Sequence, residues 1–493
     1  MVKVLLLNPP VRHLPGEARH ASPPLGLAYI GASLEAQQIP VRIIDAVTLG
    51  YDVKHDYAPD VTGIGATPEM ISDAVRDFAP DLIGISCLFT MSSCIAYSFA
   101  RHFRQLCPQA KIVFGGTHAT VMARDLVREA FCDFVVRGEG ERAMIQLAES
   151  LDGRRAMSDV NGLTWLNSDQ EVVDNPQLFI EDIDSLPRPA RHLLDMESYI
   201  KIGRMQGGAY SQKARATTLI TSRGCPAKCV FCAIHSVWGR KFRGHSPEYV
   251  LAELEDLKKT YGITHLLFED DNLTYDPVRS THIFQGMIEA RMDFTWDTPN
   301  GVALWRLDEP LIRLMKAAGC NRLFIAIESG VQDTLFKLVR KPLRLDQAEA
   351  LIAVCRSLRL PTTAFFVIGF PGETVAAITE SLAYAERLPT NTVAIMIATP
   401  YPGTPLYDQC VKMGYLVKDF DVNRLYTRVG QISTPDFTPE LLFRLITRTQ
   451  VRRAWRFPLS TGSRLFRKCV EDPRALITFL GRRFLTPLRK PRS

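Results

Sequence analysis

Short apolar runs that alternate with amphipathic stretches set the pattern of the first 150 residues. Five runs have the length and composition of buried strands, and they cover residues 2–7, 41–45, 81–86, 111–116 and 134–138. Helical apolar spacing lies between them, as in residues 25–38. Strands and helices that alternate in this way form a doubly wound parallel sheet. We therefore predict an α/β, Rossmann-like unit over residues 1–150.

A less regular stretch, residues 151–215, separates this unit from the next. Two apolar segments, 161–166 and 171–173, flank a polar turn at 167–170, which is typical of a β-hairpin. Residues 186–191 are rich in proline and arginine. We interpret the stretch as a connector.

A second alternating region covers residues 216–410. It contains six strand candidates, at residues 216–222, 264–269, 294–298, 322–328, 363–368 and 392–398. Helical segments such as 247–261 and 309–318 lie between them. Repeated βα units form a parallel barrel, and six units leave the barrel incomplete. We predict a partial (β/α)6 TIM-type barrel whose chemistry takes place at the carboxyl ends of its strands.

Three cysteines follow the first barrel strand at the spacing C-x-x-x-C-x-x-C: Cys225, Cys229 and Cys232. Gly224 and Pro226 make this segment a loop. A structural zinc site normally requires four protein ligands. Three thiolates can instead hold a four-iron cluster that has one open iron. The alternative is that the cysteines are small buried side chains without a metal, and we favour the cluster.

The other barrel strands also end in polar residues or glycines. These ends are residues 269–272, Asn300, residues 328–330, residues 369–373 and residues 399–404. A single acidic strand end is more often a turn or a helix N-cap. Because the strands of a parallel barrel end at one rim, we expect six such ends to converge there with the cysteines.

The loops of the first unit carry hydroxyls and paired glycines. The residues that we select as ligand contacts are Ser86, Leu88, Thr90, Gly115, Gly116 and Gly138. Glycines allow a large ligand to approach the backbone, although ordinary turn chemistry would explain any one loop. No G-x-G-x-x-G follows the first strand, so we do not expect a dinucleotide. We expect His118 at the surface or at a helix cap.

The barrel motifs resemble those of radical S-adenosylmethionine (SAM) enzymes. The resemblance rests on the cysteine triplet with Phe231 before its last member, the acidic end of the second strand, E-S-G at 328–330 and G-F-P-G-E at 369–373. It implies that Cys225, Cys229 and Cys232 hold a [4Fe-4S] cluster whose open iron chelates SAM. The implied SAM contacts are Phe231, Asp270, Glu328, Ser329, Gly369 and Glu373. Lys228 would offset the negative charge of the cluster.

The loops of the first unit are similar to those of the cobalamin-binding domain. Ser86-x-Leu88 and Gly115-Gly116 match its S-x-L and G-G elements, and the resemblance implies that the six contacts named above bind cobalamin. The D-x-H-x-x-G motif is missing, because no histidine follows Asp45. The resemblance therefore implies base-off cobalamin without a histidine ligand.

Together, the two resemblances identify the chain as a member of the cobalamin-dependent radical SAM family. They imply that a reduced cluster cleaves SAM and that a 5′-deoxyadenosyl radical removes a hydrogen from the substrate. Methylcobalamin then donates the methyl group, and a second SAM remethylates the corrinoid. We expect a methyltransferase that acts on an unactivated carbon, or on phosphorus, of a small molecule. The electrons would come from an external flavodoxin- or ferredoxin-type reductant.

Two alternatives to methyl transfer stay open. One is an oxidative cyclase or rearrangement enzyme, related to the anaerobic Mg-protoporphyrin monomethyl ester cyclase branch. The other is a protein that only carries electrons or binds a corrinoid. The carboxylates at the barrel rim and the E-S-G motif argue against this last alternative, because an electron carrier needs no SAM pocket.

Composition indicates where the protein acts. The 493 residues are 46% hydrophobic and 23% charged, as in a globular protein of more than one domain. Eleven cysteines without paired spacing indicate a reducing compartment. The first apolar run is too short for a signal peptide, and no stretch approaches the roughly 20 apolar residues of a membrane span. We expect a cytoplasmic protein.

The last residues, 411–493, form a basic region in which aromatic and leucine residues are interleaved with arginines and lysines. We predict that it is mainly helical and that it caps the barrel. Contact with an anionic membrane surface is the alternative. Nucleic acid is not expected, because no nucleic-acid-binding module accompanies the charge.

Overall fold

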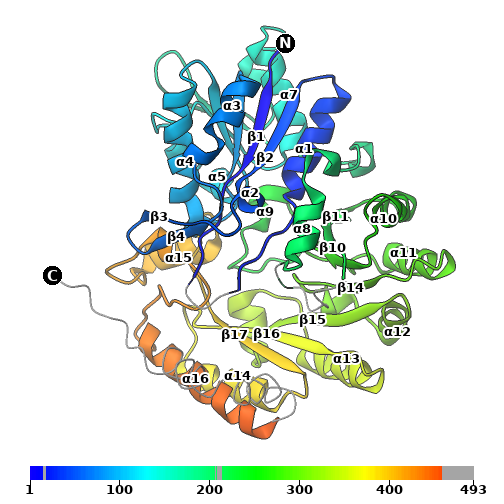
Figure 1. Cartoon of the computed structure of the whole chain (residues 1–493). Helices are drawn as coiled ribbons and strands as arrows, with labels where there is room; N and C mark the ends of the chain where they lie inside the picture. Colours follow the sequence, from blue (N-terminus) through cyan, green and yellow to red (C-terminus); the bar gives the residue numbers. More distant parts are fainter. Residues whose placement is uncertain (15–17, 206, 208–213, 458–493) are drawn as a thin grey trace.

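The computed structural model describes residues 1–14, 18–205, 207 and 214–457. Within these residues the chain forms a seven-stranded sheet and a six-stranded open barrel (Figure 1). We call the first sheet and its helices the N-terminal unit. Its five parallel strands are β1 (Val4–Asn8), β2 (Val41–Asp45), β5 (Leu82–Ser86), β6 (Lys111–Gly115) and β7 (Phe134–Val136). Their order, β2-β1-β5-β6-β7, is that of a doubly wound sheet and confirms the predicted fold.

Helices cover both faces of this sheet, because its strands are apolar on both sides. Leu6 packs in a core with residues of α1 (Leu25–Ala36) and α7 (Gly140–Leu151). Leu5 and Leu7 face the opposite core, which contains residues of α3 (Ser72–Phe78) and α4 (Ser93–Leu106). Short helices α2 (Ala46–Leu49) and α5 (Thr117–Val121) follow strand ends, and α6 (Ala123–Leu126) follows α5.

Two antiparallel hairpins accompany the parallel strands. The predicted hairpin forms as β8 (Leu163–Leu166) and β9 (Val172–Asp174), and it extends the same sheet beyond residue 150 because β8 pairs with β7. The other hairpin, β3 (Lys54–Ala58) with β4 (Val61–Ile64), was not expected. Lys54, His55 and Asp56 are exposed, so this strand lacks the apolar pattern that identifies a buried one.

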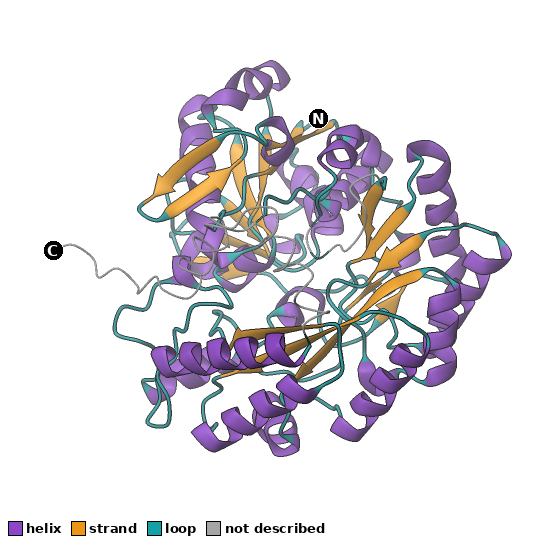
Figure 2. Ribbon diagram, turned by 60° about the horizontal axis from the view of Figure 1, so that its bottom comes forward, coloured by secondary structure: helices purple, strands orange, loops and turns teal. Residues whose placement is uncertain are grey.

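The barrel consists of six parallel strands in chain order. They are β10 (Ala216–Leu219), β13 (His265–Phe268), β14 (Thr295–Asp297), β15 (Cys320–Glu328), β16 (Thr362–Ile368) and β17 (Thr392–Ile397). Five helices lie on the outer side (Figure 2): α10 (Pro247–Tyr261), α11 (Pro277–Glu289), α12 (Glu309–Ala317), α13 (Leu345–Ser357) and α14 (Val375–Arg387). The predicted partial barrel is confirmed, and its open edges are β10 and β17.

The remaining helices link or cap these two parts. They are α8 (Met196–Ile202), α9 (Ile234–Trp238), α15 (Pro405–Met413) and α16 (Pro439–Arg456). Buried Arg453 of α16 donates to the carbonyl oxygens of Ala385, Leu388 and Thr390 at the end of α14. The beginning of the basic region therefore caps a barrel helix, whereas its last 36 residues, 458–493, lie outside the described residues. In the part of the chain that the structure describes, no helix combines the length and apolarity of a membrane span.

Candidate functional site

The three cysteines lie in a loop whose base is closed by a short β-ribbon. We call residues 224–242 the cysteine segment. It begins after β11 (Ser222–Arg223) and ends before β12 (Arg243–Gly244), and these strands pair antiparallel, with Arg223 opposite Arg243. Gly224 has a φ of +82°, and a Cβ there would lie 2.2 Å from the Lys241 carbonyl oxygen. Only glycine permits this sharp entry into the segment.

The chemistry of this donor set fits an iron–sulfur cluster. Cys229 is buried, and Cys225 and Cys232 are half-buried. The pKa of the Cys229 thiol is raised to about 11 and that of Cys232 to about 12, mainly by burial, and the nearby Cys225 contributes to both increases. Three thiolates so close together require bound cations to stay ionised.

A single metal ion is a poorer fit. Within residues 1–14, 18–205, 207 and 214–457, no three His, Cys, Asp or Glu side chains are placed to hold one ion together. A four-iron cluster instead takes each cysteine on a different iron, so its ligands need not meet at one point. Cys225, Cys229 and Cys232 would hold such a cluster.

Two neighbours of the cysteines are Asn272, from the strand end 269–272 that we expected at this rim, and Lys341, which no sequence pattern indicates. The Asn272 side-chain amide donates to the Cys225 sulfur over 2.6 Å. Lys341 is buried, and its positive charge lowers the pKa values of Cys225 and Cys229 against the opposing effect of burial. Lys228, which we had expected in this role, is exposed. The buried cation beside the thiols therefore comes from residue 341, after β15, because tertiary packing brings it there.

Asp270, a predicted SAM contact, supports the cysteine segment. Its carboxylate is fully buried and accepts from the backbone amide of Thr221 and from the hydroxyls of Thr221 and Ser222. These bonds fix the residues that immediately precede the segment. The adjacent Asp271 has an Oδ2 atom without a hydrogen-bond partner, and burial raises its pKa to about 7. Of the two carboxylates, Asp271 is therefore the one with an oxygen free to accept a hydrogen bond from a ligand.

Glu328 and Ser329 lie at the end of β15, and both are buried. Glu328 accepts from the Lys341 ammonium over 2.8 Å. Ser329 contacts the Ser381 hydroxyl and accepts from the backbone amide of Val331. The structure therefore brings Glu328 to the cysteine side of the barrel, while the hydroxyl of Ser329 is engaged with α14.

Gly369 and Glu373 form a closed turn after β16. The Glu373 carboxylate accepts from the backbone amides of Gly369 and Phe370 at 2.7 and 2.8 Å. The Phe370 ring packs 5.9 Å from the ring of Phe231. The predicted SAM contacts at this strand end thus adjoin the cysteine segment through an aromatic pair.

The predicted cobalamin contacts share one edge of the first sheet. Ser86 and Gly115 are partners in the neighbouring strands β5 and β6, and Gly138 lies in the loop after β7, the strand next to β6. Gly116 has a φ of +101°, and a Cβ there would lie 2.8 Å from the Cys87 carbonyl oxygen. Leu88 beside it is 51% exposed. A glycine cradle and an uncovered apolar side chain fit the approach of a large, partly apolar ligand.

Two polar residues of this edge have structural roles. His118, which we expect at the surface or at a helix cap, is buried in the first turn of α5, and its ring contacts the hydroxyls of Thr90 and Tyr97 at 3.1 and 2.7 Å. Burial lowers its pKa to about 4, which keeps the ring neutral. Asp45 caps α2 and accepts from Tyr199, so its carboxylate joins the N-terminal unit to the connector.

The strand ends that carry the predicted cobalamin contacts adjoin the barrel end that carries the cysteines. A Cβ on Gly138 would lie 3.1 Å from the carbonyl oxygen of Val237. The side-chain amide of Gln177 donates a hydrogen bond to the carbonyl oxygen of Ser236. Both carbonyls belong to the cysteine segment. The loop after β7 therefore contacts the segment that carries the cysteines.

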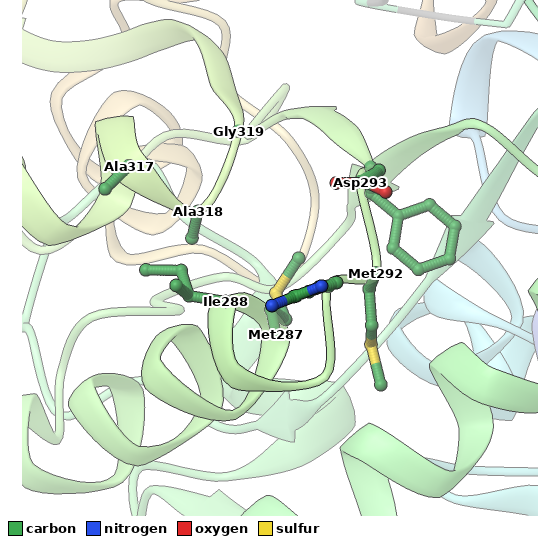
Figure 3. Close-up of a pocket in the computed structure, with 9 residues that line it drawn as sticks. Met287, Ile288, Met292, Asp293, Ala317, Ala318 and Gly319 are labelled. Atoms are coloured by element: carbon green, nitrogen blue, oxygen red, sulfur yellow. The ribbon is translucent and has the colours of Figure 1, made fainter.

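A separate cavity of about 380 Å³ lies elsewhere on the barrel. It is formed by the end of α11, Asp293 and Phe294 before β14, and residues 317–319 before β15 (Figure 3). These are the amino ends of the strands, opposite to the rim that carries the cysteines. We therefore assign this cavity no part in the chemistry of that rim.

Comparison with known proteins agrees with this geometry. Residues 14–148 match the B12 binding domain, and residues 219–385 match the Radical SAM superfamily. The chain is 32% identical to cytidylyl-2-hydroxyethylphosphonate methyltransferase of Streptomyces wedmorensis over 462 residues, which cover 88% of this chain and 86% of the relative. It is 26% identical to the anaerobic magnesium-protoporphyrin IX monomethyl ester cyclase of Rubrivivax gelatinosus, over 88% and 74% of the two chains.

Solved structures show the same fold. The radical SAM methyltransferase TsrM of Kitasatospora setae, with cobalamin and a [4Fe-4S] cluster bound, aligns with a TM-score of 0.68 at 18% identity and covers 85% of this chain and 79% of its own. The enzyme OxsB, with aqua-cobalamin and SAM bound, aligns with a TM-score of 0.70 at 18% identity, over 98% and 71% of the two chains. With both domains and a full-length relative, this chain belongs to the cobalamin-dependent radical SAM enzymes, whose cofactors are a [4Fe-4S] cluster, SAM and cobalamin.

Proposed function

We propose that this enzyme transfers a methyl group to an unactivated carbon, or to phosphorus, of a small molecule. The observation that carries the proposal is the contact between Gly138, at the edge expected to hold cobalamin, and Val237 of the cysteine segment. Methyl transfer requires the corrinoid and the radical source to reach one substrate atom, and this contact joins their two binding regions. The full-length similarity to a methyltransferase supports the same function.

The protein side chains bind, orient and shield the cofactors. Cys225, Cys229 and Cys232 would hold the cluster, with Asn272 and Lys341 beside them. Ser86, Leu88, Thr90, Gly115, Gly116 and Gly138 would hold base-off cobalamin without a histidine ligand. When bound, the cluster and SAM supply the hydrogen-abstracting radical, and the corrinoid supplies the methyl group. Phe231, Asp270, Glu328, Ser329, Gly369 and Glu373 would form or support the SAM site.

We propose an acidic substrate. A pocket of about 450 Å³ is lined by Arg19, Tyr51, Lys201, Ile202 and Arg204. The positive charges of Arg19 and Arg204 both lower the pKa of Tyr51, against the opposing effect of burial, so both guanidinium groups lie near this residue. Three cationic side chains favour a phosphate, phosphonate or carboxylate group. This agrees with the phosphonate in the name of the Streptomyces relative.

An anaerobic assay tests the reaction type. The reconstituted enzyme is incubated with SAM, methylcobalamin, a reductant and cytidylyl-2-hydroxyethylphosphonate or related acidic compounds as probes. Deoxyadenosine together with S-adenosylhomocysteine and a methylated product supports methyl transfer. Deoxyadenosine with a modified but unmethylated product supports the cyclase alternative. The similarity to an anaerobic cyclase is the reason to test for this product. If no probe yields either product, the proposed substrate class is refuted.

The electrons would come from an external flavodoxin- or ferredoxin-type protein. Exposed Lys228 lies between two cluster cysteines, and exposed Arg240 donates to the Ala227 carbonyl oxygen beside it. Such a cationic surface suits an acidic electron carrier. The double variant Lys228→Glu/Arg240→Glu should slow reduction by flavodoxin but leave reduction by dithionite unchanged. If flavodoxin reduces the double variant as fast as wild type, the proposed docking surface is wrong.

We propose a cytoplasmic enzyme, because an oxygen-sensitive cluster and ten described cysteines without disulfides suit a reducing compartment.

We also propose a cobalamin domain at 1–150, a connector at 151–215, a barrel at 216–410 and a basic region at 411–493. Membrane contact through the basic region is testable by sedimentation with anionic vesicles, before and after removal of residues 458–493.

A further inference from the structure

A buried ion network joins the loop after β7 to the base of the cysteine segment. The Arg223 guanidinium donates to Glu139 over 3.0 Å and to Glu141 over 2.6 Å. Arg243, the strand partner of Arg223, donates to both carboxylate oxygens of Glu139 at 2.8 and 3.0 Å. No side chain of the four is more than 5% exposed. We call these four residues the inter-unit network.

The members of the network lie in or next to the segments that carry the candidate cofactor contacts. Glu139 follows Gly138, the predicted cobalamin contact, and Glu141 lies in the first turn of α7. Arg223 comes two residues before Cys225, and Arg243 directly follows the cysteine segment. The network therefore links the corrinoid edge of the sheet with both ends of the segment that carries the cluster ligands.

Aromatic rings and backbone groups complete the surroundings of the two arginines. The Arg223 guanidinium lies 5.3 Å from the ring centroids of both Tyr29 and Trp238. Arg243 also donates to the carbonyl oxygens of Ile180 and Trp238. Two positive and two negative groups are thus enclosed together, and within them the buried Arg223 Nε lacks a hydrogen-bond partner.

Stability alone does not explain such a network. Burying ions has a large desolvation cost, and well-packed apolar residues in the same place are often equally or more stable. Its specific property is orientation, because a planar guanidinium that bonds two carboxylates accepts few relative positions of its partners. The network can therefore fix how the sheet edge faces the cysteine segment.

We infer that the inter-unit network is a positioning device that sets the distance and orientation between the corrinoid and the iron–sulfur cluster. The inference rests on the proposed function, in which both cofactors serve one substrate atom. Rates of oriented reactions fall steeply with misplacement, by up to roughly 100-fold for about 1 Å. Arg223, Arg243, Glu139 and Glu141 are thus positioning residues, which act through the segments that they join.

The test measures the geometry directly. Cobalt(II) in cobalamin and the reduced cluster each carry an unpaired electron, so pulsed electron paramagnetic resonance on the dithionite-reduced holoenzyme reports the distance between them. The variant Glu141→Gln keeps the shape of the side chain and removes one ion pair. We expect it to bind the wild-type amounts of iron and cobalt but to show a shifted or broadened cobalt–cluster distance distribution. If this variant fails to fold, Arg223→Lys replaces it, because lysine keeps the charge and loses the planar fork.

Glu253→Gln is the matched control. Glu253 pairs with Arg191 over 2.6 Å and is 2% exposed, but this pair joins the connector to α10 and lies outside the network. We expect a wild-type distance distribution for the control. A distribution in Glu141→Gln equal to wild type, or one equally altered in Glu253→Gln, overturns this inference alone. A wild-type protein that binds no corrinoid overturns the proposed function and the inference with it.

Discussion

Lys341 donates to Glu328 over 2.8 Å, and each of the two side chains is only 7% exposed. The pair lies beside the cysteines, because the charges of both residues act on Cys229. It joins the end of β15 to the turn before α13. A cation and an anion buried together in this way depend on each other for charge compensation.

Replacing the cation of this pair should destabilise the fold. Lys341→Met leaves the Glu328 carboxylate buried without its partner, and we expect a loss of about 3–5 kcal/mol in the free energy of unfolding. The double variant Lys341→Met/Glu328→Gln should recover much of this loss, because it removes both charges. Denaturant unfolding at equal cofactor content measures the effect. A single variant as stable as wild type would show that the pair is not coupled.

The cluster assignment predicts a clear difference among the cysteines. Cys229→Ala should lose the visible absorption of the [4Fe-4S] cluster and the iron bound after anaerobic reconstitution, because two thiolates remain where three are needed. Cys94→Ser is the control, since Cys94 is half-buried in α4 of the N-terminal unit. Iron analysis and absorption spectra check both. A full cluster in Cys229→Ala would refute the ligand assignment.

The sequence predicts those parts of the molecule that local patterns specify. The helix expected at 247–261 forms with these bounds, because Ser246 caps it, Pro247 occupies its first turn and Gly262 ends it in the left-handed region. All six barrel strands are also found near their predicted positions. Most of them are short runs rich in apolar side chains, and glycine or polar residues follow them.

Partners that are distant in the chain could not be predicted in this way. Arg223 and Glu139 are 84 residues apart, and nothing near either residue indicates the other. The run of acids at 269–271 shows a different limit, because successive side chains of an extended segment point in different directions. Asp270 turns toward Thr221, while Asp271 keeps an oxygen without a hydrogen-bond partner. The sequence shows the acidic strand end but not which carboxylate faces the site.

The glycine cradle of the first sheet predicts a selective effect on cobalamin binding. Gly116→Ala places a Cβ 2.8 Å from the Cys87 carbonyl oxygen, so the loop must shift and the corrinoid should bind more weakly. The cobalt-to-protein ratio after anaerobic reconstitution measures this.

Gly153→Ala separates backbone strain from loss of the cradle. Gly153 also has a positive φ, +74°, but a Cβ there meets no atom within 4 Å. We expect it to cost about 1–2 kcal/mol of stability through the left-handed backbone and to leave cobalamin binding unchanged. Equal cobalt content in the Gly116 and Gly153 variants would contradict the assignment of the cradle.

Glu373 predicts a pH dependence of stability. Burial raises its pKa from 4.5 to about 7, in spite of the amides of Gly369 and Phe370 that bond its carboxylate. Between these two values the folded state binds the proton more tightly than the unfolded state, so its contribution to stability falls as pH rises from 4.5 to about 7. Glu373→Gln cannot titrate and should lack this decline. Its stability relative to wild type should therefore increase across the window and level off at either end.

Unfolding of wild type and Glu373→Gln at equal cofactor content, between about pH 5 and pH 7.5, measures this difference. Glu380→Gln is the control for the substitution itself, because Glu380 lies exposed on α14, the helix that follows the turn. Glutamine retains a carbonyl oxygen that can accept from the two amides, so the turn after β16 should keep its shape. Parallel stability curves for wild type and Glu373→Gln across this range would show that residue 373 is already ionised throughout, and that burial does not govern its protonation.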